Sequence, residues 1–297
     1  RSFAPIHERN NINLGQLMGS LNQLIQLQNG DVLGLNEFTS KHNSASAAIL
    51  ESGGLIPFTS NLKNGSVVIP SIEREEGPMT MFEKLIDRKR IGGKGKILPG
   101  DSVVARVDSG YSHEFTSAQV HAFLKQAHGD EYSVQNPGKF AVFEDHLLYA
   151  TFNPKFAPLE HKIQELRDVQ SEFQKHTGVR DYSAVNGISP GICHQVAREE
   201  FIDIGDFVQA TDSHTCMGGS SNALAFGVGA TEYAALIEGG LTFVNVPESI
   251  RFEFTGVLPS NVTAKDVMLY ILAKHARNEE TLDRAMEFGG PGLASMS

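Results

Sequence analysis

The stretch from Phe207 to Gly219 reads Phe-Val-Gln-Ala-Thr-Asp-Ser-His-Thr-Cys-Met-Gly-Gly, and it indicates how the chain folds. Its first four residues are mostly apolar and predict a short buried strand. Asp212, Ser213 and His214 follow that strand directly, and a Gly-rich turn then leads into a predicted helix of small residues from about Ser221. A strand, a polar turn and a helix in this order form the repeating unit of an α/β sheet.

The same alternation continues along the chain. The apolar patterns predict strands at 103–107, 140–143, 207–210 and 250–255, and helices at 80–89, 116–127, 158–176 and 263–276. Thr80 and Glu83 have the spacing of a capping box, which marks the start of the first of these helices. We therefore predict an α/β fold with a mostly parallel sheet, in which polar residues just past the strand ends line the ligand crevice.

Composition excludes several classes of protein. The chain has 297 residues, with 25 Lys plus Arg against 35 Asp plus Glu, a formal charge of −10. This charge disfavours general binding of nucleic acids or anionic membranes, and every apolar run is too short or too interrupted to span a bilayer. The two cysteines, Cys193 and Cys216, indicate a reducing compartment, which predicts the cytoplasm or, in a eukaryote, the mitochondrial matrix.

Two segments precede the main α/β unit. Residues 1–58, punctuated by Asn29-Gly30 and Gly53-Gly54, are predicted to form a small α/β fragment. Residues 59–77 are polar and contain Asn64-Gly65 and Pro70, a composition typical of a solvated linker. The main unit is predicted to begin at Pro78 and to run to Ser297.

Asp212, Ser213 and His214 place a carboxylate, a hydroxyl and an imidazole before a glycine turn. The hydroxyl and free backbone N–H groups suit a bound carboxylate, while Asp212 can orient a histidine or a water molecule. A plain helix N-cap explains the same tripeptide, since Asp, Ser and Thr are the preferred capping residues. Both interpretations stay open on these residues alone.

Three further histidines lie at predicted loop or strand-end positions. His146 follows Asp145 at the end of a predicted strand, and His194 and His113 lie in two other motifs. Each alone is more often a structural or surface histidine. Together with His214 they indicate proton chemistry, because histidine exchanges protons near neutral pH.

The motifs taken together resemble the aconitase and isopropylmalate isomerase family. The resemblance is carried, in family order, by Pro99-Gly-Asp-Ser-Val-Val-Ala-Arg-Val-Asp108, Ser112-His-Glu-Phe-Thr-Ser117, Phe143-Glu-Asp-His146, Gly191-Ile-Cys-His-Gln195, Thr211-Asp-Ser-His-Thr-Cys-Met-Gly-Gly219, Asn222-Ala-Leu-Ala-Phe-Gly-Val-Gly-Ala-Thr-Glu232 and Val262-Thr-Ala-Lys-Asp-Val267. Arg1-Ser-Phe-Ala-Pro-Ile-His-Glu-Arg-Asn10 and Glu51-Ser-Gly-Gly-Leu-Ile-Pro-Phe58 are similar to the second half of the family's swivelling α/β domain, the small subunit in isopropylmalate isomerases. The resemblance implies three-layer α/β domains after residue 78.

The resemblance also implies a role for each motif residue. It implies a hydro-lyase that reversibly dehydrates a small hydroxy di- or tricarboxylic acid such as citrate, isopropylmalate or homocitrate. The implied catalytic residues are Asp145, His146, His194, Asp212 and His214, and the implied substrate-binding residues are His113 and Ser213.

The family's cofactor does not match the cysteines of this chain. Aconitases hold a [4Fe-4S] cluster through three cysteines, and the resemblance places them beyond Ser297, so no metal ligand is expected here and the cluster is expected only in the complete enzyme. The catalytic serine would come from the missing half of the swivelling domain, so the expected partners are the remaining domains or a second subunit. The alternative hypothesis is an inactive relative with a structural or RNA-binding role.

Overall fold

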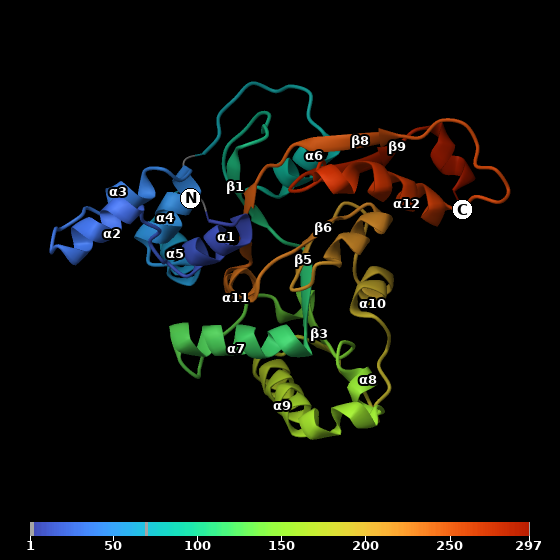
Figure 1. The fold of residues 1–297 in the computed structure, drawn as a ribbon, viewed down its shortest axis with the longest axis horizontal. Coiled ribbons are helices and arrows are strands. Elements are labelled where there is room, and N and C mark those ends of the chain that lie inside the picture. Colours follow the sequence, from blue (N-terminus) through green and yellow to red (C-terminus); the bar gives the residue numbers. More distant parts are fainter. Residues whose placement is uncertain (1–2, 69–70, 297) are drawn as a thin grey trace.

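The computed structural model describes residues 3–68 and 71–296, with a five-stranded parallel sheet at its centre. Its strands lie in the order β4-β3-β2-β5-β6, and Figure 1 labels β3, β5 and β6 of this sheet. Their bounds are β2 (Ser109–His113), β3 (Phe140–Phe143), β4 (Arg180–Tyr182), β5 (Phe207–Ala210) and β6 (Leu224–Gly227). The prediction of an α/β fold with a mostly parallel sheet is confirmed.

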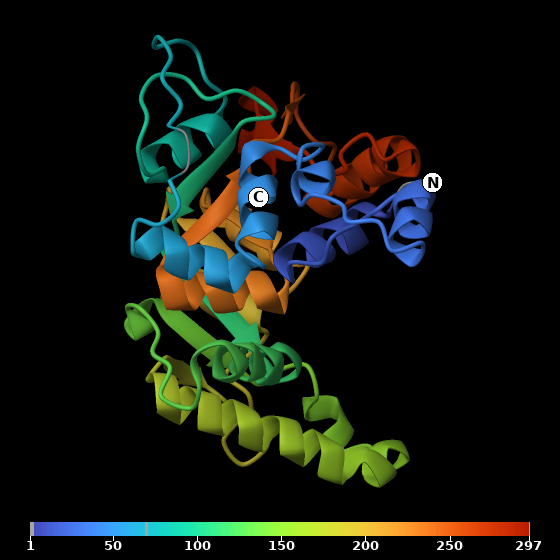
Figure 2. The same cartoon turned by 90° about the vertical axis from the view of Figure 1, so that its left-hand side faces the viewer.

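Helices cover both faces of this sheet. They are α7 (Glu114–His128), α9 (Glu160–Thr177) and α11 (Ala230–Gly239) on one face and α10 (Cys193–Glu200) on the other. Figure 2 shows α7 and α9 side by side in green and yellow-green. The alternation of strand side chains explains the two layers, since Val142 packs with the α7 face and Phe143 with the α10 face.

Shorter elements connect this frame. They are α8 (Leu148–Thr151) and the 3-10 turns η1 (Pro137–Lys139), η2 (Pro154–Leu159) and η3 (Thr215–Ser221). Helix α9 ends at Gly178, whose φ of 72° is the left-handed conformation that glycine adopts readily. The predicted helix at 158–176 is therefore confirmed with a start two residues later, because Pro158 belongs to η2.

The region after Gly219 differs from the prediction of a helix from about Ser221. Residues 215–221 form the turn η3, Leu224–Gly227 form strand β6, and the helix α11 begins only at Ala230. Asn222, with a φ of 56°, ends the turn and allows β6 to pair with β5. Small residues predicted a helix here, but pairing with a buried neighbouring strand decided the conformation.

The remaining strands lie outside the parallel sheet. Strand β1 (Ser102–Arg106), predicted at 103–107, pairs antiparallel with β7 (Leu241–Asn245). Strands β8 (Ser249–Glu253) and β9 (Ala285–Gly289) pair parallel with helix α12 (Ala264–His275) between them, and the turns η4 (Ala276–Asn278) and η5 (Pro291–Ser295) follow α12 and β9. Helix α6 (Met81–Lys89) has the predicted Thr80 and Glu83 capping box.

The opening segment is helical, which corrects the predicted α/β fragment. Its described residues form α1 (Pro5–Asn13), α2 (Leu21–Gln28), α3 (Asn36–Thr39), α4 (Ser44–Glu51) and α5 (Leu55–Lys63), without a strand in residues 3–63. The Gly and Asn residues that punctuate this segment lie at helix ends. Asn29 is the C-cap of α2, Gly54 is the N-cap of α5, and Gly53 and Gly54 have positive φ.

Helix α5 packs against α11, as Figure 2 shows with blue beside orange. It includes residues 59–63, so the predicted linker at 59–77 is shorter than expected, and Thr59 is buried. Arg1 and Ser2 of the swivel-domain motif, Pro70 of the linker, and Ser297 lie outside the described residues. None of the described helices is both long and apolar enough to cross a bilayer.

Candidate functional site

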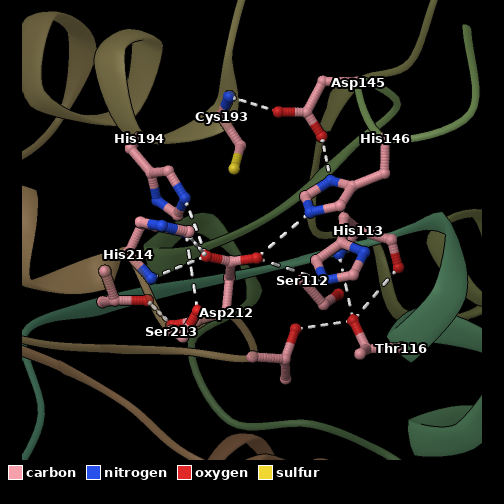
Figure 3. A network of polar contacts seen from close by, with 12 residues as sticks. Ser112, His113, Thr116, Asp145, His146, Cys193, His194, Asp212, Ser213 and His214 are labelled. Carbon is pink, nitrogen blue, oxygen red and sulfur yellow. Dashed lines mark hydrogen bonds and ion pairs between the residues drawn. The ribbon is translucent and has the colours of Figure 1, made fainter. Parts of the chain in front are cut away.

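The carboxyl ends of three neighbouring strands bring the predicted residues together (Figure 3). His113 is the last residue of β2, Asp145 and His146 follow β3, and Asp212 to His214 follow β5. His194 comes from the first turn of α10. The carboxyl ends of parallel strands meet at one edge of the sheet, so residues far apart in sequence share one site.

Asp145 and His146 form a direct pair. Asp145 Oδ1 lies 2.6 Å from His146 Nδ1, and Asp145 Oδ2 accepts the backbone N–H of Cys193 at 2.6 Å. Both residues lie past the end of β3, where the backbone leaves the strand, so the opposite facing of strand neighbours does not separate them. The pair is thereby anchored to the start of α10.

Opposing effects set the charges of this pair. The hydrogen bond to Asp145 raises the pKa of His146 to about 9, although burial alone would lower it. Burial would raise the pKa of Asp145, but the bonds from His146 and the Cys193 N–H hold it below its ordinary value. At neutral pH the pair is therefore a carboxylate beside an imidazolium.

Asp212 is the acceptor for groups from three directions. Its Oδ2 lies 3.1 Å from His146 Nε2, and its Oδ1 lies 2.9 Å from His194 Nε2 and 2.7 Å from the backbone N of His214. Burial would raise the pKa of Asp212, but the His214 N–H and the histidines lower it to about 2. Asp212 therefore stays ionised and links the Asp145–His146 pair to His194.

Ser213 and His214 lie at the open side of this network. The His214 side chain is 82% exposed, and its Nδ1 lies 3.3 Å from Asp212 Oδ1 and 3.5 Å from the Ser213 hydroxyl oxygen. Asp212 Oδ1 accepts the backbone N–H of His214, two residues later, and the capping hypothesis explains this local hydrogen bond. Capping leaves the contacts of Asp212 to His146 and His194 unexplained, because these come from other parts of the chain.

His113 stacks on His146. The ring centroids lie 3.8 Å apart at an angle of 11° between the planes. Burial, and then the positive charge of His146, lower the pKa of His113 to about 4, so His113 is neutral. Its Nδ1 is buried and has no hydrogen-bond partner among the described residues.

Two residues that support the site were not predicted from sequence. Glu114 is fully buried at the start of α7 and accepts the backbone N–H groups of Asp145 at 3.3 Å and Leu147 at 2.5 Å. Burial raises its pKa. Tyr111, in β2, places its hydroxyl 2.7 Å from His194 Nδ1. A Glu in a first helical turn and a Tyr in a strand are ordinary structural residues, so no sequence pattern distinguishes either as part of a site.

A glycine allows β6 to lie against the site. A Cβ on Gly227 would lie 2.4 Å from the backbone oxygen of Asp212, closer than real Cβ contacts. Gly227 is also the register partner of Ala210, the last residue of β5. A larger residue at 227 would therefore displace the backbone that carries Asp212.

Neither of two compact groups of side chains is assigned as a metal site. His113, Glu114 and His146 form one group, and His194, Asp212 and His214 form the other, each with candidate ligand atoms within 4.8 Å of one another. Both carboxylates accept N–H groups of the protein, two at Glu114 and three at Asp212, and we assign no ion to either group.

In a comparison with known proteins, residues 83–297 match the family model of the aconitase family (aconitate hydratase). The methanogen homoaconitase large subunit of Methanocaldococcus jannaschii is 33% identical over 218 residues, 73% of this chain and 47% of that protein. A probable 3-isopropylmalate dehydratase large subunit of Methanothermobacter thermautotrophicus is 35% identical over 221 residues, 74% and 49% of the two chains.

A plant protein is also similar to this chain. The chloroplastic 3-isopropylmalate dehydratase large subunit of Arabidopsis thaliana is 28% identical over 241 residues, 78% of this chain and 47% of that protein. The chain spans about half the length of the curated relatives it matches.

Proposed function

Because this chain belongs to the aconitase family, we propose that it is the site-bearing part of a hydro-lyase that removes and re-adds water on a small hydroxy di- or tricarboxylic acid. One observation carries the proposal. An unbroken series of hydrogen bonds runs from Asp145 through His146 and Asp212 to His194, and it opens to solvent at His214. Relatives named homoaconitase and 3-isopropylmalate dehydratase support this reaction class.

His146 is the acid in the proposed reaction. Dehydration breaks a carbon–oxygen bond, and the hydroxyl leaves as water once it gains a proton. With a pKa of about 9, His146 carries a proton at neutral pH, and Asp145 stabilises that charge. In the reverse direction the neutral imidazole takes the proton back from water, as microscopic reversibility requires.

The other site residues bind and orient the substrate. Asp212, His194 and His214 surround the position where the hydroxyl or water would lie. Ser213 and His113 would contact a substrate carboxylate. A base must also remove the proton from the neighbouring carbon, and we assign this step to a residue of the swivelling domain outside the chain.

The cysteines of this chain do not fit a [4Fe-4S] cluster. The sequence has two cysteines, of which Cys193 is buried in the α10 face of the sheet and Cys216 is exposed. The family's cluster needs three thiolates. We therefore derive no step through a cluster. We propose that the cluster ligands belong to the part of the relatives' length that this chain does not span.

Loading the 297-residue chain with iron and sulfide under anaerobic conditions is expected to give no stable cluster. Two thiols in different environments cannot replace three convergent ones. Iron and sulfide analysis after desalting measures the outcome. Retention of a full cluster that is lost in Cys216→Ser would show that the ligand argument is wrong.

The same comparison and the cysteines support proposals for the partner and the cellular compartment. Relatives named as large subunits suggest a small subunit or a fused swivelling domain as partner, and we propose that residues 1–58 are part of such a domain, followed by a linker and the catalytic unit from residue 78. Free thiols are consistent with a reducing compartment, the cytoplasm or a mitochondrial matrix.

The test of the proposed function is hydration of an unsaturated acid by the complete protein. We expect turnover with one of three substrates, cis-aconitate or the alkenes derived from isopropylmalate and homocitrate. The loss of the ultraviolet absorbance of the double bond measures it. A fully loaded protein that hydrates none of them would favour the inactive relative instead.

A further inference from the structure

The imidazole of His194 has a partner on each of its ring nitrogens. Nε2 lies 2.9 Å from Asp212 Oδ1, and Nδ1 lies 2.7 Å from the hydroxyl oxygen of Tyr111. His194 and Tyr111 are both buried, with exposures of 7% and 1%. A buried imidazole held at both ends has its proton positions determined by its neighbours.

The two neighbours differ in what they can donate. Asp212 is ionised and can only accept, so Nε2 of His194 carries the hydrogen of that bond. Tyr111 keeps its proton, because burial raises the pKa of its phenol. Burial also lowers the pKa of His194, which favours the neutral ring. A neutral ring with hydrogen on Nε2 has a lone pair on Nδ1, and the Tyr111 hydroxyl donates to it.

The other charged and titratable groups around His194 do not change this assignment. Asp145 and Asp212 favour the protonated ring, and His214, whose ring centroid lies 5.9 Å away, opposes it. Asp145 is already paired with His146 and with the Cys193 N–H, and burial, the strongest influence on the pKa of His194, acts toward the neutral form.

We propose that Tyr111 is a positioning residue that fixes His194 as the neutral Nε2–H tautomer, so that His194 holds the Asp212 carboxylate and does not itself exchange protons with substrate. Both nitrogens of His194 are then committed to protein groups. His146 is also held at both nitrogens, by Asp145 and Asp212, but it carries the extra proton of an imidazolium at neutral pH, so the proton exchanged with substrate is assigned to His146. The tautomer rests on the two contacts of His194 and on the charge states of Asp212 and Tyr111, and its effect on turnover rests on the proposed function.

Packing allows the hydroxyl of Tyr111 to be removed without moving its ring. The ring makes edge contacts with Phe143, at 5.5 Å between centroids, and with Phe201, at 6.2 Å. Tyr111→Phe therefore keeps these aromatic contacts and removes only the hydrogen-bond donor. The chain also contains a matched pair outside the site, in which the Tyr132 hydroxyl lies 2.6 Å from His121 Nδ1 and Glu172 lies 3.2 Å from His121 Nε2.

Nitrogen-15 NMR of the histidine rings in the 297-residue chain tests the tautomer. At pH 7 we expect a protonated Nε2 and an unprotonated Nδ1 for His194. In Tyr111→Phe the neutral ring loses a donor, so the pKa of His194 should rise by about one pH unit, the scale of one hydrogen bond. Tyr132→Phe should shift His121 and leave His194 unchanged.

Three outcomes would overturn the proposal. They are a protonated Nδ1 on His194 in the unaltered chain, an unchanged His194 titration in Tyr111→Phe, and an equal response of His194 to Tyr132→Phe. The first needs no variant, so the proposal stays testable even if Tyr111→Phe does not fold.

Turnover separates the positioning role from the proposed function. In the complete protein, Tyr111→Phe should lower kcat about tenfold, leave KM nearly unchanged and shift the pH profile. If the unaltered protein is active and Tyr111→Phe leaves both kcat and the pH profile unchanged, only the role of Tyr111 in turnover is refuted. Inactivity of the unaltered protein would refute the proposed function, and the NMR result would still decide the tautomer.

Discussion

Asp212→Asn is expected to lower the kcat of the complete protein by about 10³-fold, within the range for groups that control proton transfer. The Asp212 carboxylate accepts N–H groups from His146, His194 and His214. An asparagine has one acceptor oxygen and an NH2 group, so at least one of these donors would face another donor. Removal of the negative charge should also lower the pKa of His146, which the carboxylate helps to keep protonated.

Two measurements check this prediction. Steady-state hydration kinetics give kcat, and proton NMR titration of the 297-residue chain gives the pKa of His146. Asp206→Asn is the matched control, because Asp206 also accepts a backbone N–H but lies outside the site. A kcat for Asp212→Asn within tenfold of the unaltered protein would contradict the central place given to this carboxylate.

His214→Asn is expected to lower kcat by about 10²-fold while leaving folding intact. The imidazole of His214 is mostly exposed, and its Nδ1 reaches Asp212 on the open side of the site. The backbone N–H that bonds Asp212 remains in the variant, so the local turn persists. A surface side chain of this kind contributes about 0.5 kcal/mol or less to stability.

The comparison separates a catalytic imidazole from a turn residue. The free energy of unfolding comes from urea titration and kcat from the hydration assay, with the unaltered protein and the variant loaded identically. His161→Asn, an exposed histidine on α9, is the control and should change neither. Turnover like that of the unaltered protein in His214→Asn would leave this histidine with a structural role only.

The sequence predicted the sheet well where apolar runs ended in polar residues. The runs at 140–143 and 207–210 are β3 and β5. Parallel strands end at one edge of the sheet, and His146 after β3 accordingly lies 3.1 Å from Asp212 after β5. The prediction failed at Leu224–Gly227, because small residues suit a helix and a strand equally until a partner strand is known. The opening helices were missed because Asn and Gly end helices as readily as they form strand turns.

Part of the site was outside the reach of sequence reasoning. The pairing of Asp212 with both His146 and His194 depends on the order of strands in the sheet, which local patterns do not contain. Tyr111 and Glu114 contact the site through a ring nitrogen and through backbone N–H groups, and neither contact depends on a recognisable spacing. The roles assigned to the predicted residues remain proposals that the variants above test.

The pairing of β2 with β5 has a consequence for how the protein folds. Ser109 pairs with Val208, and the chain between them includes β3, α9 and α10. Contacts between such distant segments form late in folding, because the entropy of closing a long loop is lost before these contacts contribute any stabilising free energy. Asp212 meets its histidines only after that closure. A folding intermediate that contains β2 and β3 but not β5 would hold His146 beside Asp145 without Asp212, its second carboxylate. The complete site should therefore form in one cooperative step, when β5 pairs with β2.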